Sequence, residues 1–191
     1  PRSEAQFLGE RGFAGDRSFE AGHHTPNMDV HAFSLDHYPH YEGLAGKPFA
    51  IPSFGENLSL RGGIDTDVCI GDLFAAGTAL LEVSQPTERC GTPGRSAGVP
   101  ALRKWIFECL YTGYYLRVVR TGWVRRGDEL LLRERRLPDW TVDRVNRAMY
   151  ERFDDAEQFE AMLALPLLSS DWKDRANVLR ERRRAAQQRP A

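Results

Sequence analysis

The sequence predicts a mainly β protein of the α+β class, an antiparallel β-barrel or sandwich followed by a helical C-terminal subdomain. Two patterns predict it. Up to residue 137, short alternating apolar segments are separated by Gly and Pro turns, which is typical of strands. From Pro138 onward the apolar residues recur at helical spacing. The change divides the 191 residues into a barrel domain, 1–137, and a helical subdomain, 138–191.

The first clear strand is expected at residues 30–34, where apolar residues alternate with polar ones around His31. If His31 is buried in that strand, its ring needs a hydrogen-bond partner. A short helix is expected to begin within residues 35–41 and to be cut by Pro39.

A second alternating strand is expected at residues 58–60, after the glycine-led polar pair Glu56 and Asn57. That pair either caps a turn or presents its side chains to a ligand. Residues 68–72 and 78–83 are then expected to form two strands joined by a turn.

One interior helix is expected next, because Leu102, Ile106 and Leu110 recur every four residues. Gly113 is expected to end it. Cys109 lies on its buried side and is a poor catalytic candidate.

Two further strands are expected at 114–119 and 129–134, with Arg117 either solvated or pointing into a polar cleft. The C-terminal part predicts three helices, one capped by Asp139, one near 155–164 and one beginning near Ser170. The last helix ends in a run of arginines. A solvated helix end is favoured over an RNA site there, because no aromatic residues interleave for base stacking.

Composition excludes several classes of function. The net charge of −1 argues against bulk attraction to nucleic acid or anionic membranes. No apolar run approaches the roughly 20 residues that span a bilayer. The N-terminus does not resemble a signal peptide and lacks an initiator Met, so a preceding segment is expected.

The three cysteines, Cys69, Cys90 and Cys109, form no disulfide framework and no Cys-x-x-Cys pair, which favours a reducing, cytoplasmic location. All five histidines lie before residue 41, but their spacings fit no familiar zinc motif.

Cys90 stands in a loop between Arg89 and Arg95. Glycines and a proline at residues 91–94 are expected to keep this loop from forming a helix or a strand. Nearby cations stabilise a thiolate, and a thiolate can bind a metal centre. The alternative is an ordinary free cysteine on the surface.

An ordered set of short motifs resembles MOSC domain proteins of the YiiM-like branch. The motifs cover most of the chain and lie at residues 15–16, 23–38, 54–58, 68–72, 82–90, 112–118, 139–142 and 145–146. The resemblance implies a MOSC-like β-barrel with an interior helix, followed by a three-helix piece.

The resemblance also implies a molybdenum cofactor (molybdopterin) and the reduction of N-hydroxylated compounds, such as 6-hydroxylaminopurine, to amines. Cys90 would ligate the metal, and His31 would donate a proton or orient the substrate. An unidentified electron donor is implied, pyridoxal phosphate is not expected, and a homodimer is compatible with the family. The remaining site residues would bind the cofactor: His23, Glu56, Asn57, Gln85, Arg95 and Arg117.

The chain departs from the family pattern in two places. The family motif His-Gly-Gly-Pro-Asp-Lys-Ala-Val-His corresponds to residues 23–31, where Met28 replaces the lysine. Residues 91–94 replace bulkier ones. Two alternatives therefore stay open, a diverged non-catalytic barrel that binds an anion or cofactor, and a sulfur carrier that forms a persulfide on Cys90.

Overall fold

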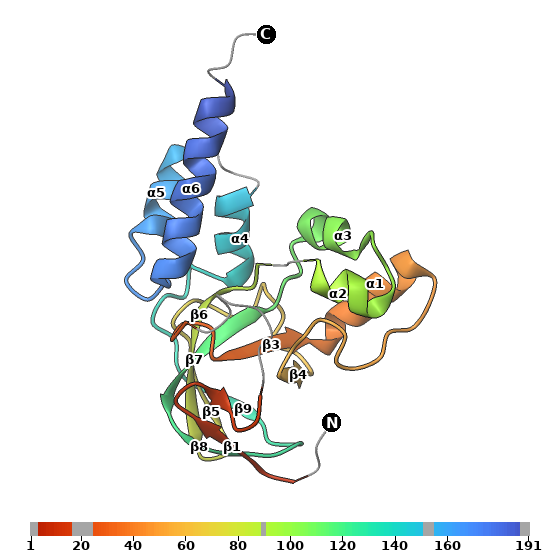
Figure 1. Cartoon of the computed structure of the whole chain (residues 1–191). Helices are drawn as coiled ribbons and strands as arrows, with labels where there is room; N and C mark the ends of the chain where they lie inside the picture. The colour runs from red at the N-terminus through yellow and green to blue at the C-terminus, as the bar shows by residue number, and fades with distance from the viewer. Residues whose placement is uncertain (1–3, 17–24, 89–90, 151–154, 188–191) are drawn as a thin grey trace.

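The computed structural model describes residues 4–16, 25–88, 91–150 and 155–187, and it places two groups of helices against a curled sheet (Figure 1). The strands in chain order are β1 (Gln6–Gly9), β2 (Gly12–Phe13), β3 (Val30–Ser34), β4 (Leu58–Leu60), β5 (Leu73–Ala76), β6 (Ala79–Pro86), β7 (Tyr114–Arg120), β8 (Gly122–Val124) and β9 (Leu130–Glu134). The helices are a 3-10 turn (Leu35–His37), α1 (Tyr38–Ala45), α2 (Thr92–Ala97), α3 (Leu102–Cys109), α4 (Val142–Tyr150), α5 (Ala156–Leu163) and α6 (Ser170–Gln187).

The larger sheet has the strand order β4-β3-β7-β6-β5-β9, and β2-β1-β8 form a smaller one. Neighbouring strands are antiparallel except for β3 and β4, which are parallel. The sheet is therefore mixed. It curls into a half-barrel, and the predicted α+β class with a helical C-terminal part is confirmed.

The first strand of the predicted pair at 68–83 is misplaced. The structure has a turn at residues 68–72, with one isolated bridge at Cys69, and the strand β5 begins only at Leu73. The cause is Asp72, whose carboxylate accepts the Cys69 N–H at 2.9 Å, and Gly71, whose φ of +78° turns the chain.

Three helix predictions are also corrected. Pro39 occupies the first turn of α1, where no backbone donor is needed, so it begins the helix rather than cutting it. Pro93 does the same for α2, which occupies the segment predicted as an irregular loop. Helix α3 ends at Cys109 and is capped by Leu110, which adopts φ +58° three residues before Gly113.

One hydrophobic core runs from the inside of the half-barrel into the C-terminal helices. Leu116 of β7, Val145 of α4 and Trp172 of α6 all belong to it and are almost fully buried. A second cluster around Phe33 and Ile106 lies under α1 and α3. The helices of the C-terminal part thus share the barrel's core. None of the helices within the described ranges is both long and apolar enough to cross a membrane.

Candidate functional site

A row of polar side chains crosses the three central strands of the sheet. His31 of β3 and Gln85 of β6 each pair in register with Tyr115 of β7. Their neighbours Ala32 and Leu116 belong to the core, so the row lies on the opposite face of the sheet. The ring centroids of His31 and Tyr115 are 5.4 Å apart, and both His31 and Gln85 are only 4% exposed. Two of the predicted site residues are therefore brought together, with Tyr115 between them.

Asn57 fixes the backbone at His31. Its Oδ1 accepts the His31 N–H at 2.8 Å, and its own N–H donates to the His31 carbonyl at 2.9 Å. Its Nδ2 donates to Asp16 at 2.7 Å. The side-chain amide of Asn57 therefore holds β3 and its surroundings in place.

Glu56 is buried and bonded within its own loop. Its carboxylate accepts the Tyr38 hydroxyl at 2.5 Å, the Phe54 N–H at 3.0 Å and the Ser59 hydroxyl at 3.2 Å. This geometry is that of a loop-capping residue, the first of the two roles that the sequence left open for the pair.

Arg117 and Arg95 lie in different surroundings. Arg117 forms an ion pair with Glu82 at 3.4 Å and donates to the Leu167 carbonyl at 3.1 Å, which commits it to the contact between barrel and helices. Arg95 is exposed on α2 and donates to Thr92 at 2.9 Å.

Cys90 and His23 lie outside the described residues, so their roles stay predictions. The other two thiols are described. Burial raises the pKa of Cys69, and burial likewise raises the pKa of Cys109, whose thiol lies 3.1 Å from the Tyr41 hydroxyl. Both thiols are therefore poor nucleophiles at neutral pH.

A buried carboxylate that sequence reasoning missed orders the turn before β7. Asp65 is 1% exposed and lies 2.8 Å from His37 Nε2. Its other oxygen accepts the Thr112 and Gly113 N–H groups, both at 3.0 Å, and the Thr112 hydroxyl at 3.1 Å. A single acid in a polar segment carries no sequence signal for such a network.

The turn at Thr112 and Gly113 lies against the row of His31, Tyr115 and Gln85. A Cβ built on Gly113 would stand 3.2 Å from His31 Nε2 and 2.4 Å from the Ala32 carbonyl oxygen. The Gly113 carbonyl accepts the Thr87 N–H at 3.0 Å. Asp65 thus fixes a backbone segment that touches both His31 and the end of β6, which leads to Cys90.

The first turns of α6 form another side of this region. Asp171 accepts the Thr25 hydroxyl at 2.6 Å and the Asn27 amide at 3.0 Å. Arg175, one turn later, forms an ion pair with Glu88 at 2.5 Å. Ser169, the residue before α6, donates its hydroxyl to the side-chain oxygen of Gln85. The sequence offered no signal that linked this helix to the site.

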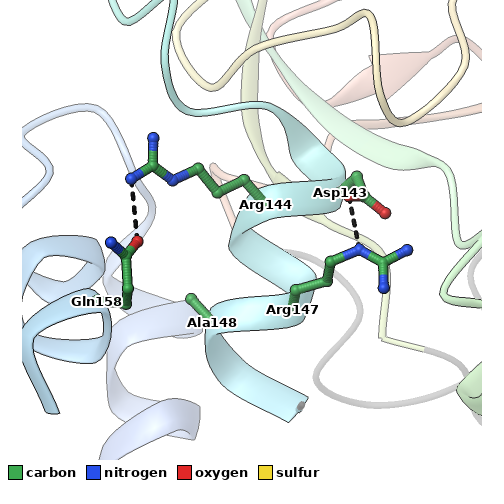
Figure 2. Close-up of a pocket in the computed structure, with 5 residues that line it drawn as sticks. All are labelled: Asp143, Arg144, Arg147, Ala148 and Gln158. Carbon is green, nitrogen blue, oxygen red and sulfur yellow. Dashed lines mark hydrogen bonds and ion pairs between the residues drawn. The ribbon is translucent and has the colours of Figure 1, made fainter. Parts of the chain in front are cut away.

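Outside this region, a surface cavity of about 280 Å³ lies between α4 and α5 and is lined by Asp143, Arg144, Arg147, Ala148 and Gln158 (Figure 2). Figure 2 shows the two guanidinium groups on opposite sides of α4. Arg144 donates to Gln158 at 3.0 Å and Arg147 to Asp143 at 2.8 Å. Cations that diverge and are already paired do not form an anion site. Within the described ranges, no three His, Cys, Asp or Glu side chains gather as a metal site.

The model of the MOSC domain matches residues 20–131, and the model of the YiiM-like 3-alpha helix domain matches residues 140–177. The uncharacterized protein YflK of Bacillus subtilis (strain 168) is 32% identical over 174 residues, which are 91% of this chain and 79% of that protein. Protein YiiM of Escherichia coli (strain K12) is 28% identical over 86% of this chain and 75% of its own length.

A protein of Gibberella moniliformis (strain M3125 / FGSC 7600) named "Reductase" is 33% identical over 76% of this chain, but this match spans only 27% of its length. Two crystal structures resemble the fold with a TM-score of 0.83. YiiM from Geobacillus stearothermophilus is 29% identical and matches 94% of this chain and 86% of its own. YiiM from Escherichia coli is 25% identical and matches 95% and 87%.

Proposed function

Because this chain belongs to the MOSC domain family and carries a YiiM-like 3-alpha helix domain, we propose that it is a molybdenum cofactor-dependent reductase of N-hydroxylated compounds. The observation that carries the proposal is the row of His31, Tyr115 and Gln85, in which His31 and Gln85 are buried and Gln85 lies on β6, the strand that leads to Cys90. The relative named "Reductase" supports the reaction class.

The described residues around the row fit a polar cofactor. The Thr87 hydroxyl, three residues before Cys90, is buried without a hydrogen-bond partner, so it has a bond to offer to a ligand. Cys90 would ligate molybdenum through its thiolate. Arg95, on the helix that follows Cys90 directly, would pair with the cofactor's phosphate. Arg117 is less suited to that role, since Glu82 and the Leu167 carbonyl already hold its guanidinium.

Reduction of an N–OH group to an amine consumes two electrons and two protons and releases water. The cofactor, when bound, supplies the electron-transfer chemistry, and an external donor must refill it. His31 would deliver a proton to the leaving hydroxyl, since its ring lies on the row and its backbone is fixed by Asn57. The ring of Tyr115, tilted beside the His31 ring, would form one wall of the substrate site.

The test uses protein expressed in cells that make the cofactor, with 6-hydroxylaminopurine as substrate and a reduced viologen dye as electron donor. Cys90→Ala is expected to lose molybdenum. His31→Gln is expected to keep molybdenum while kcat falls about 100-fold or more, the usual contribution of a general acid. His40→Gln, an exposed histidine, is the control and keeps full activity.

The proposal fails if the folded protein contains no molybdenum, or if His31→Gln is as active as His40→Gln. A protein without molybdenum that carries a persulfide on Cys90, seen by mass spectrometry, would be a sulfur carrier instead. The proposal also includes a cytoplasmic location, and a homodimer is compatible with it.

A further inference from the structure

Strand β9 forms one edge of the six-stranded sheet, and within the described ranges it pairs with β5 alone. Its residues after Leu130 are all exposed, and Leu131 and Leu132 are exposed by 43% and 45%. Adjacent side chains of a strand point to opposite faces, so neither face of this edge is covered. A strand with one neighbour also presents unpaired backbone N–H and C=O groups along its outer side.

The opposite edge of the sheet is protected. Strand β4 is three residues long and partly buried throughout, and its residues Leu58 and Leu60 pack against the main core. Strand β9 is longer and has three leucines in succession. Exposed apolar edges of this kind pair readily with another strand. Of the two edges of this sheet, β9 is therefore the one that is open to a partner strand.

Two charged side chains flank the centre of this edge. Glu129 directly precedes β9, and Arg133 lies within it, each two residues away from Leu131. Both are exposed, and neither side chain forms a hydrogen bond or an ion pair within the described ranges. Because side chains alternate along a strand, the acid, the leucine and the base follow one another on one face.

This order of charges is complementary to a second copy of itself. In an antiparallel pair with a two-fold axis at Leu131, Leu131 lies opposite the partner's Leu131, and Glu129 lies opposite the partner's Arg133. The symmetry forms the same ion pair twice, and directly opposite side chains of unlike charge stabilise a strand pair. A shift of the register by one residue separates Glu129 from Arg133. The charges therefore select one register.

We propose that β9 is a homodimer interface, in which two copies of the chain pair their β9 strands antiparallel about a two-fold axis at Leu131. The pairing joins the two sheets into one. It stops at two copies, because it uses the open β9 edge of each. Strand β5 separates β9 from β6, so the interface lies beyond the strands that carry His31, Tyr115 and Gln85. The inference does not rest on the proposed function.

The size of the interface predicts its strength. Stable complexes bury about 1,200–2,000 Å² in total, and two short edge strands bury less than that. The dimer is therefore expected to be reversible, with a Kd of roughly 1–100 μM. Sedimentation equilibrium over roughly 1–500 μM brackets this Kd, and the wild type should change from monomer to dimer across that range.

The first experiment exchanges the two charges. Arg133→Glu places two carboxylates opposite each other on both sides of the axis, and Glu129→Lys does the same with two cations. Each change turns two attractive pairs into repulsive ones and should weaken the dimer about 10- to 100-fold. The double variant, Glu129→Lys with Arg133→Glu, restores both pairs and should return Kd to within about threefold of the wild type.

The control is Arg182→Glu, which makes the same charge change at an exposed residue of α6, far from β9 (Figure 1). It should keep the wild-type Kd. All the substituted side chains are exposed, so each variant should fold, which circular dichroism and Tm confirm. Hydrogen exchange locates the interface in the wild type. The amides of residues 130–133 should exchange more slowly at high than at low protein concentration, while those of residues 182–187 should not change.

Three results would overturn the inference. The first is a wild type that stays monomeric at the highest concentration, which would leave this edge to a strand of another protein. The second is a dimer that Arg133→Glu and Glu129→Lys leave intact, or whose concentration-dependent protection lies outside β9. The third is a double variant that dimerises as weakly as the single variants. None of these measurements needs molybdenum or turnover, so a dimer without reductase activity would remove only the proposed function.

Discussion

Asp65→Ala tests whether the buried carboxylate holds the turn beside His31. The substitution leaves three buried partners without an acceptor, namely His37 Nε2 and the N–H groups of Thr112 and Gly113. An unpaired buried group costs about 1–3 kcal/mol, and removing one member of a buried charged network costs about 3–5 kcal/mol in total. For a chain of this size that lowers Tm by roughly 6–20 °C.

Asp65→Asn separates shape from charge. The amide oxygen still accepts from Thr112 and Gly113, so the loss is expected to be smaller, about 1–2 kcal/mol. Urea unfolding followed by tryptophan fluorescence measures both losses. Asp67→Ala is the matched control, because Asp67 is exposed and lies two residues along the same loop. An Asp65→Ala protein that unfolds at the same urea concentration as Asp67→Ala would refute the argument.

Three further outcomes follow from the same geometry. Gly113→Ala places a Cβ 2.4 Å from the Ala32 carbonyl oxygen, at a residue whose φ is +69°. The substitution should lower the free energy of unfolding by more than about 2 kcal/mol in urea unfolding. A smaller loss would contradict the close contact between Gly113 and Ala32. Asp72→Ala leaves the Cys69 N–H without its acceptor and removes the bidentate partner of Arg135, which keeps its bond to the Asp67 carbonyl, so it should cost about 1–3 kcal/mol; a loss under about 1 kcal/mol would show that water replaces the carboxylate. Because burial raises the pKa of Cys69 and of Cys109, their thiolate fractions are low at pH 7. Iodoacetamide should therefore label both thiols slowly below pH 9 and faster as the pH rises, as followed by mass spectrometry. Rapid labelling of either thiol at pH 7 would contradict this.

The elements with a strong repeat were predictable from the sequence. Apolar and polar residues alternate over residues 30–34, which predicts the strand β3. Leu102 and Ile106 recur at helical spacing, which predicts the helix α3. The short strands β1, β2 and β8 span two to four residues, too few to display a period. The helix α2 was missed because Pro93 and its flanking glycines indicate a loop, although proline is favoured in a first turn.

The candidate site was predictable where a residue could be matched to a motif, as for His31 and Gln85, and not where its role depends on tertiary contacts. Tyr115 enters the site only through the register of three strands that lie far apart in the chain. Asp65 and Gly113 are 48 residues apart in sequence, and no local pattern links them. Their roles follow from the packed fold alone.

Helix α6 helps to position the candidate site because its side chains bond to the segment before β3 and to the segment after β6. Asp171 holds Thr25 and Asn27, which precede β3, and Arg175 holds Glu88, which follows β6. The two side chains are four residues apart and therefore lie on one face of α6. The exposed ion pair of Arg175 with Glu88 contributes little stability by itself, about 0–1 kcal/mol, so its main effect is to fix the position of the loop. A barrel residue such as His31 therefore depends for its surroundings on a helix that begins about 140 residues later in the chain.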